Sequence, residues 1–183
     1  VLIALIAMTL GQFGTYSSGG AMAYTNMNIF KNELILPVGA IVIELRDVLT
    51  GRLKARDIYK NMFVTAGKNS LADALRGTTA NSKGIITYCA VGTGTTVPAL
   101  ADTDLQTELF RKLVSVRSVS TNVATFKTYF TATEANGTLR EAGLFGDDAS
   151  GTADSGTLFC RAAINRTKTS SDTLTLSWTV TIG

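Results

Sequence analysis

Residues 173–182, TLTLSWTVTI, alternate strictly between hydroxyl-bearing and apolar side chains. Successive side chains of a β-strand point to opposite sides, so an extended strand gathers each kind on its own face. The apolar face consists of Leu174, Leu176, Trp178, Val180 and Ile182. A helix would scatter these residues around its circumference. The stretch therefore predicts a long antiparallel strand with one face in a core and the other facing solvent or a neighbouring subunit.

Further stretches with strand character precede this one and are separated by turn residues. They are residues 39–47, 52–59, 84–91, 113–120, 124–131, 138–145 and 157–164. The Asn136-Gly137 pair predicts a tight hairpin turn, and residues 146–156 predict the tip of a long hairpin. Residues 104–112, DLQTELFRK, are expected to start as a helical turn. The fold class that follows is mainly β, an antiparallel β-sandwich.

One short helix is predicted after the second strand. Thr65 offers a hydroxyl at the N-cap position, and Gly77 supplies a C-terminal stop. The apolar face of this helix is expected to contain Leu71, Ala72 and Leu75. We expect the helix to cover one end of a sheet.

Residues 1–30 stand apart from the strand pattern. The apolar run at residues 1–10 is half of the roughly twenty residues that span a bilayer. A signal peptide with a cleavage site at residues 21–23 is an alternative, although no basic residue precedes the run. Residues 11–20, GQFGTYSSGG, have the composition of a flexible linker. We therefore expect an N-terminal arm that contacts other subunits, followed by a β-sandwich domain at residues 31–183.

The composition describes a packed protein with little charge. Of its 183 residues, 45% are hydrophobic and 17% are charged, with a formal net charge of +3. Such a chain can bury one core, and the low charge indicates that other subunits cover much of its surface. Lysine and arginine are spread along the chain without the dense stripe that nucleic-acid binding needs. We expect neither nucleic acid nor a membrane as a partner.

The residue inventory restricts catalytic chemistry. The chain contains no histidine, which excludes Ser–His–Asp and Cys–His nucleophile arrangements and the commonest zinc and iron ligand sets. Cys89 and Cys160 lie far apart within predicted strands. They are interpreted as buried thiols that act as small apolar residues, while a disulfide between adjacent strands stays open.

Two loops have the composition of a ligand site. Residues 92–96, GTGTT, resemble a phosphate-binding loop but lack its Gly-Lys-Ser/Thr ending, which favours a turn of the sandwich. Asp147, Asp148 and Asp154 carry oxygen ligands suited to calcium. Their spacing fits no EF-hand loop, so a polar hairpin tip is the simpler interpretation.

Glu134 and Glu141 are the candidate catalytic carboxylates. Glycoside hydrolysis requires two carboxyl groups at a set separation, and these two would lie near each other across the Asn136-Gly137 turn. The simpler interpretation is a pair of charged positions at a strand edge, where charge discourages stray strand pairing. We therefore predict no catalytic residue here.

Several stretches together resemble a module of tailed-bacteriophage and prophage virion proteins, of the tail, tail-fibre or minor structural type. They are AVGTGTTVPA at 90–99, DTDLQTELFR at 102–111, EANGTLREAGLFG at 134–146 and KTSSDTLTLSWTVT at 168–181. Residues 43–77 are similar to the lead-in of the same proteins, with the turn Thr65-Ala66-Gly67-Lys68-Asn69 before a short helix. The resemblance covers about residues 41–183.

The resemblance implies a non-enzymatic structural role in a virion, with the protein in several symmetric copies in the tail. No catalytic residue defines this family, so we expect no catalytic, cofactor-binding or metal-binding residues and no cofactor. The implied partners are other copies of the chain and other virion structural proteins, with a host surface receptor as a further candidate. The alternatives are a head decoration protein or a glycan- or receptor-binding module of a tail fibre. Glycan binding favours clustered aromatic residues, whereas Tyr16, Tyr24 and Tyr59 are dispersed.

Overall fold

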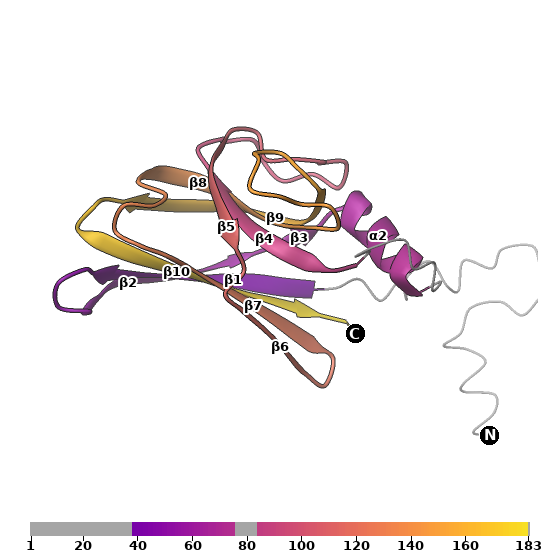
Figure 1. Ribbon diagram of the computed structural model, residues 1–183, viewed down its shortest axis with the longest axis horizontal. Coiled ribbons are helices and arrows are strands. Elements are labelled where there is room, and N and C mark those ends of the chain that lie inside the picture. The colour runs from indigo at the N-terminus through magenta and orange to yellow at the C-terminus, as the bar shows by residue number, and fades with distance from the viewer. Residues whose placement is uncertain (1–37, 76–83, 183) are drawn as a thin grey trace, which may run out of the picture. The chain divides into compact units, whose positions relative to one another are not determined.

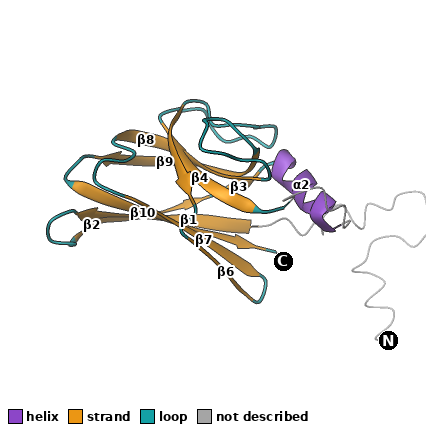
Figure 2. Ribbon diagram, viewed as in Figure 1, coloured by secondary structure: helices purple, strands orange, loops and turns teal. Residues whose placement is uncertain are grey.

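The computed structural model describes residues 38–75 and 84–182 (Figure 1). Ten strands in this part of the chain form two five-stranded antiparallel sheets with one helix beside them (Figure 2). This arrangement confirms the predicted mainly-β sandwich with one short helix. The expected N-terminal arm, residues 1–30, and the expected helix stop at Gly77 lie outside the described residues.

We call the two sheets A and B. Sheet A contains, in spatial order, β2 (Leu53–Lys60), β1 (Val38–Asp47), β10 (Asp172–Thr181), β7 (Val123–Phe130) and β6 (Val116–Ser120). Sheet B contains β3 (Met62–Phe63), β9 (Thr157–Lys168), β8 (Gly137–Gly146), β4 (Ile86–Gly92) and β5 (Glu108–Leu113). Helix α2 (Thr65–Leu75) follows β3. Both sheets therefore draw on strands from distant parts of the chain.

Strand β10 occupies the centre of sheet A, between β1 and β7. Its side chains alternate as predicted, with Trp178 fully buried and Thr179 only partly exposed on the other face. Trp178 is paired across the sheet with Ile41 on β1 and Phe126 on β7. The predicted apolar face fails only at Ile182, which follows the end of the strand and is 47% exposed.

The main core lies between the two sheets and contains both cysteines. Cys89 and Cys160 are free thiols, and each is paired with Leu144 on the intervening strand β8. Two strand spacings separate them, roughly 10 Å, and a disulfide needs Cα atoms within about 7 Å. Burial raises the pKa of Cys89 to about 12. The interpretation as buried thiols is confirmed.

A second, smaller core lies on the outer side of sheet B. Its buried members are Val64, Ala90, Leu105, Phe145 and Leu158. Leu105 belongs to the loop 93–107, and Ala149 of the loop 147–156 packs against the same cluster. Sheet B is thus covered on both faces, whereas the outer face of sheet A has no described element packed on it.

Three local predictions are wrong. Asn136-Gly137 does not close a hairpin, because β7 belongs to sheet A and β8 to sheet B, so this turn carries the chain from one sheet to the other. The predicted strand 113–120 is divided, because Leu113 ends β5 in sheet B and residues 116–120 form β6 in sheet A. Residues 104–107 form bends that lead into β5, with no helical turn. The amides of Gln106 and Thr107 donate to the side chain of Glu141, so a side chain fixes this segment in a non-helical conformation.

The helix is present but its details differ from the prediction. The carbonyl of Val64 accepts a hydrogen bond from the Lys68 amide at 3.1 Å, so Val64 takes the N-cap position and Thr65 is the first helical residue. Leu71 packs against the main core, whereas Ala72 is exposed. The predicted apolar face is therefore correct at Leu71 and wrong at Ala72.

The burial of Trp178 predicts a large difference between the two faces of β10. Replacing Trp178 by Ala should lower the free energy of unfolding by about 3–5 kcal/mol, as is usual for deleting a large buried aromatic side chain. Thr179→Ala, on the half-exposed face, should cost less than about 1 kcal/mol. Urea unfolding followed by circular dichroism measures both. Equal losses would contradict a sheet that is buried on one face only.

Candidate functional site

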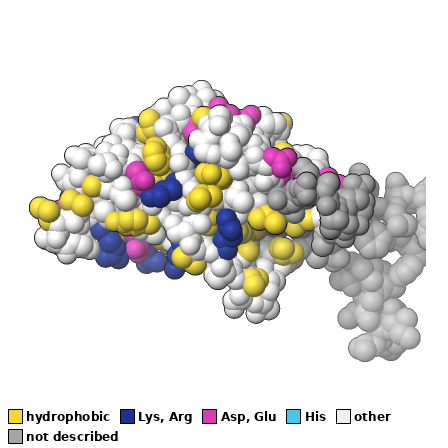
Figure 3. Space-filling view, viewed as in Figure 1, with side chains coloured by type: hydrophobic (Ala, Val, Ile, Leu, Met, Phe, Trp, Pro, Cys, Tyr) yellow, Lys and Arg dark blue, Asp and Glu magenta, His cyan; other side chains and the backbone are white. Residues whose placement is uncertain are grey.

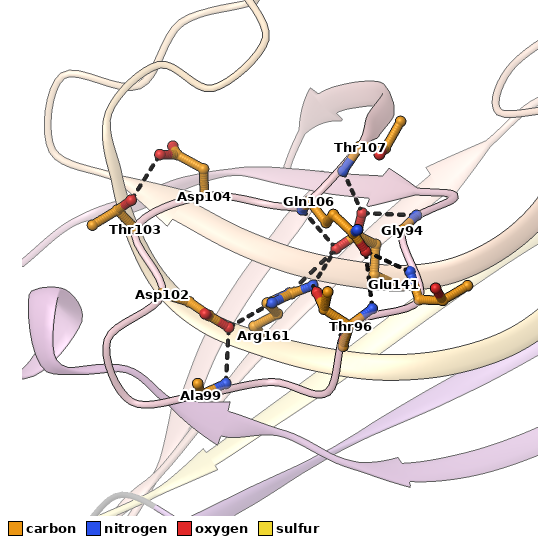
Figure 4. A network of polar contacts seen from close by, with 11 residues as sticks. Gly94, Thr96, Ala99, Asp102, Thr103, Asp104, Gln106, Thr107, Glu141 and Arg161 are labelled. Atoms are coloured by element: carbon orange, nitrogen blue, oxygen red, sulfur yellow. Dashed lines mark hydrogen bonds and ion pairs between the residues drawn. The ribbon is translucent and has the colours of Figure 1, made fainter.

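The strongest candidate site is a buried carboxylate on the outer face of sheet B. Glu141, on β8, is 1% exposed. Its Oε1 accepts hydrogen bonds from the amides of Gly94 at 3.0 Å and Thr107 at 2.8 Å, and its Oε2 accepts from the Gln106 amide at 2.9 Å. Figure 4 shows these contacts converging on one side chain. Glu141 therefore fixes both ends of the loop 93–107.

Arg161, on the adjacent strand β9, neutralises this carboxylate. Its Nη2 lies 2.7 Å from Oε2 of Glu141, and its Nη1 lies 2.6 Å from Oδ2 of Asp102 (Figure 4). Nη2 also donates to the Thr96 hydroxyl at 2.7 Å. Burial acts to lower the pKa of Arg161, and the two carboxylates more than offset this effect, so the pKa is raised overall. The guanidinium stays charged and holds the middle of the same loop.

The glycine-rich residues 92–96 do enclose an anion, and that anion belongs to the chain itself. A Cβ at Gly94 would collide with Oε1 of Glu141 and with Gln106. The side-chain oxygen Oε1 of Gln106 accepts hydrogen bonds from the amides of Thr95 at 2.7 Å and Thr96 at 2.9 Å. The predicted turn is confirmed, and the amides that resemble a phosphate cradle are already bound by Glu141 and Gln106.

A second buried ion pair fixes the neighbouring loop. Arg111 and Glu108 form a bidentate pair with both contacts at 2.6 Å, and their side chains are almost fully buried. The Arg111 guanidinium also lies 4.5 Å from the ring centre of Phe145, within the range of a cation–π interaction. It donates to the carbonyl of Ser150 at 3.2 Å and to that of Ser155 at 3.0 Å. These contacts tie the loop 147–156 to sheet B.

A third buried charge fixes the turn that joins the two sheets. Lys168 is 1% exposed and donates to Oδ1 of Asn136 at 2.8 Å and to the carbonyl of Ala132 at 3.2 Å. Desolvation lowers its pKa. In the same turn, Glu134 lies 2.6 Å from Nζ of Lys112 and accepts the Thr131 amide. Burial alone would raise the pKa of Glu134, and these two donors lower it overall.

The structure gives the two candidate catalytic carboxylates separate roles. Glu134 belongs to the turn between the sheets, and Glu141 belongs to the loop layer over sheet B. The hairpin that was expected to bring them together does not form. Each carboxylate is bound by its own cation, Lys112 or Arg161. The two carboxylates therefore belong to separate polar networks.

The candidate calcium ligands are also dispersed. Asp147 is buried and accepts hydrogen bonds from the Ser70 hydroxyl at 2.7 Å and the Gly84 amide at 2.9 Å. Asp148 is exposed. Asp154, near the other end of the loop 147–156, is close enough to Glu108 for that carboxylate to raise its pKa. Within residues 38–75 and 84–182, no three acidic, cysteine or histidine side chains gather in a way that could hold a metal ion.

A shallow hollow of about 510 Å³ lies at the turn between β1 and β2. It is lined by Asp47, Thr50, Arg52, Leu53 and Lys54. Its polar groups are largely engaged with each other, because Lys54 lies 3.1 Å from Asp47 and 2.8 Å from Asp172. Among the charged side chains that line the hollow, only Arg52 has no ion-pair partner in the described residues.

Sequence reasoning missed the three buried cations Arg111, Arg161 and Lys168. A signal for Arg161 was present, since TLFCRAAI places one arginine inside an otherwise apolar strand. Such a residue must find a counter-charge when the strand is buried. Of the tyrosines considered for glycan binding, Tyr59 donates its hydroxyl to the carbonyl of Asn165 at 3.1 Å. Tyr16 and Tyr24 lie outside the described residues.

Comparisons with known proteins leave the chain without an assigned family. No family model matches it, and neither a curated protein nor a solved structure does. In the part of the chain that the structure describes, no helix has both the length and the apolar character needed to cross a membrane.

The Glu141 network predicts a large cost for removing one charge. In Glu141→Gln, the NH2 group of the new side chain would face backbone amides that are themselves hydrogen-bond donors. Arg161 would also lose its closest buried counter-charge. Breaking a buried pair in this way costs about 3–5 kcal/mol. The matched variant Glu134→Gln removes a partly exposed pair and should cost about 1 kcal/mol or less. Urea unfolding monitored by Trp178 fluorescence tests this difference, and equal midpoints would contradict a structural role for Glu141.

Proposed function

We propose that this protein is a structural protein of the bacteriophage virion, located in the tail, its fibre or its baseplate. It acts through subunit assembly and performs no catalysis. The observation that carries this proposal is the use of the buried charges. Glu141, Arg161, Arg111 and Lys168 each hold a loop or turn in place, so the polar chemistry of the fold serves shape.

The stretches that resemble virion proteins coincide with these fixed segments. Residues 90–99 and 102–111 together contain most of the loop 93–107, which Glu141 and Arg161 hold in place. Residues 134–146 contain both the turn bound by Lys168 and Glu141 itself. The shared motifs thus encode a rigid loop layer. A rigid surface suits a protein that must dock in one orientation, because little ordering entropy is lost on binding.

The outer face of sheet A, on which no described element packs, also supports assembly. A sheet face of five strands in an otherwise packed protein is available for a partner, and low overall charge suits contact with other subunits.

Immunogold labelling of purified phage particles tests the location. Antibodies raised against the β-sandwich domain should label the tail in electron micrographs of intact particles. Labelling confined to the head surface would indicate a decoration protein. Particles that bind no antibody and yield no peptides of this chain by mass spectrometry would refute the proposal.

The absence of catalysis is a separate prediction. Broad panels of glycan and peptide substrates should show no turnover by the purified protein, because the candidate carboxylates Glu134 and Glu141 are bound by Lys112 and Arg161. Turnover that disappears in a folded Glu134→Gln or Glu141→Gln variant would identify an active site and overturn this prediction.

The expected arm gives a third prediction. A truncated protein that begins at Asn32 should still fold into a β-rich domain, because every strand that the structure describes in the two sheets begins at Val38 or later. It should lose its native oligomeric state or fail to join the particle, because an apolar run such as VLIALIAMTL at residues 1–10 is of the kind that normally marks an interaction surface. Multi-angle light scattering compares the two forms. An unchanged oligomer would show that residues 1–30 are not needed for subunit contact.

A further inference from the structure

The outer face of sheet A combines exposed apolar and basic side chains. One row across the sheet contains Ile58 on β2, Val42 on β1, Ser177 on β10, Lys127 on β7 and Val116 on β6. Ile58 is 66% exposed, and Val116 is about half exposed. The row therefore places apolar groups at both margins of the sheet with a lysine between them.

The same face carries an excess of positive charge. Arg46, Arg56, Lys60 and Lys127 lie on it, against the single carboxylate of Glu44. Glu44 is shared between Arg46 at 3.2 Å and Arg56 at 3.6 Å. Neither Lys60 nor Lys127 forms an ion pair with any described residue. We call the surface formed by Arg56, Ile58, Lys60, Lys127 and Tyr129 the basic face.

The loops over sheet B have the opposite character. Asp104, Asp148 and Asp154 lie on them with partly or fully exposed side chains. Val97 and Leu100 on the same loops are 82% and 52% exposed. The cations of this region, Arg111 and Arg161, are buried and form their ion pairs with other carboxylates, so none of these three aspartates has an ion-pair partner among the described residues. We call the surface formed by Val97, Leu100, Asp104, Asp148 and Asp154 the acidic loop surface.

Crowding of negative charge is evident at Asp154. Burial raises the pKa of its carboxyl group, the nearby carboxylates of Glu108 and Asp104 raise it further, and the positive charge of Arg111 offsets only part of this rise. A cation brought to this surface would relieve the repulsion.

The two surfaces lie on opposite sides of the sandwich. In Figure 3, basic side chains gather along the lower margin, where Figure 1 shows sheet A, and acidic side chains gather at the top over the loops. Each copy of the chain thus presents one surface of each kind, and each surface has both apolar groups and uncompensated charge.

We propose that copies of this protein associate head to tail, with the basic face of one copy on the acidic loop surface of the next. This inference deepens the proposed function, on which it rests, by naming the partner as a second copy and by naming the contact surfaces. The exposed apolar residues Val97 and Leu100 of one copy would pack among Ile58, Val116 and Tyr129 of the next, with the charges around them.

Charge decides against the symmetric alternatives. A two-fold contact between two basic faces would bring together two surfaces that both carry a positive excess, and a contact between two loop surfaces would bring together two acidic ones. Like charges opposed in an interface are strongly unfavourable. A head-to-tail contact pairs unlike surfaces and generates a ring or a filament, depending on whether the rotation closes.

The area is adequate for such a contact. The five strands lie about 4.8 Å apart and are roughly 30 Å long, so the face of the sheet has an area on the order of 600 Å². A specific interface typically buries about 800 Å² on each partner. The sheet face with its projecting side chains approaches this value.

A charge-swap experiment on the full-length protein tests the proposal. One variant, Lys60→Glu with Lys127→Glu, makes the basic face acidic. The other, Asp104→Lys with Asp148→Lys, makes the loop surface basic. Each variant alone opposes like charges and should associate at least about tenfold more weakly than the native protein. Mixed together, the two variants should regain association, because the native contact and a reversed one both become available.

Fluorescence cross-correlation between differently labelled variants measures this association, with circular dichroism to verify folding. Association of the native protein and of the mixture should weaken as sodium chloride rises from about 50 mM to about 500 mM, because salt screens exposed charges. The matched control for the first variant, Arg52→Glu with Arg140→Glu, makes the same change in net charge as that variant but outside both surfaces. It should associate as the native protein does.

Two outcomes would overturn the inference. If each variant alone associates as tightly as the native protein, association does not use these surfaces and another contact, such as the arm, produces it. If the mixture associates no better than either variant alone, the contact is not head to tail. Absence of the protein from phage particles would refute the proposed function and would leave these results unchanged, so the two failures are distinguishable.

Discussion

The buried pair of Glu141 and Arg161 is the interaction on which the loop layer of this protein depends. Three backbone amides from two separate segments converge on one carboxylate, and the arginine beside it binds Asp102 and Thr96 farther along the same loop. The loop in turn contributes Leu105 to the small core over sheet B. A single ion pair thus converts a glycine-rich connection into a fixed cover for the sheet.

Placing charges inside the protein carries a desolvation penalty that often exceeds the attraction between them. Here the penalty is offset by hydrogen bonds to backbone groups that would otherwise be buried without partners. The Arg111–Glu108 pair follows the same pattern for the loop 147–156, and Lys168 follows it for the turn between the sheets. An apolar replacement would fill the space but leave the amides and carbonyls unsatisfied. We infer that these charges specify loop conformation more than they add stability.

Local patterns in the sequence were sufficient for most of the strands, because alternation depends on neighbouring residues alone, but they missed β3 and β5. The period of two in β10 predicted its buried face correctly from Leu174 to Val180. The failures occurred where a distant residue decides the local conformation. Residues 104–107 lack a helical turn because Glu141 binds their amides, and Asn136-Gly137 leads to the other sheet because Lys168 fixes that turn. The residue types alone pointed to the candidate carboxylates Glu134 and Glu141. Their partners, Lys112 and Arg161, depend on which strands lie next to each other in the fold, and the sequence pattern does not contain that information.

The order of strands in sheet A has a consequence for how the chain reaches its native state. Strand β10 is the last of the strands that the structure describes, yet it lies in the middle of the sheet, between β1 and β7. Until it is added, sheet A consists of two separate hairpins, β1 with β2 and β6 with β7. Pairing β1 with β10 closes a loop of more than one hundred residues, a non-local contact of the kind that slows folding. A nascent chain on the ribosome therefore cannot complete its core until residue 181 has left the exit tunnel.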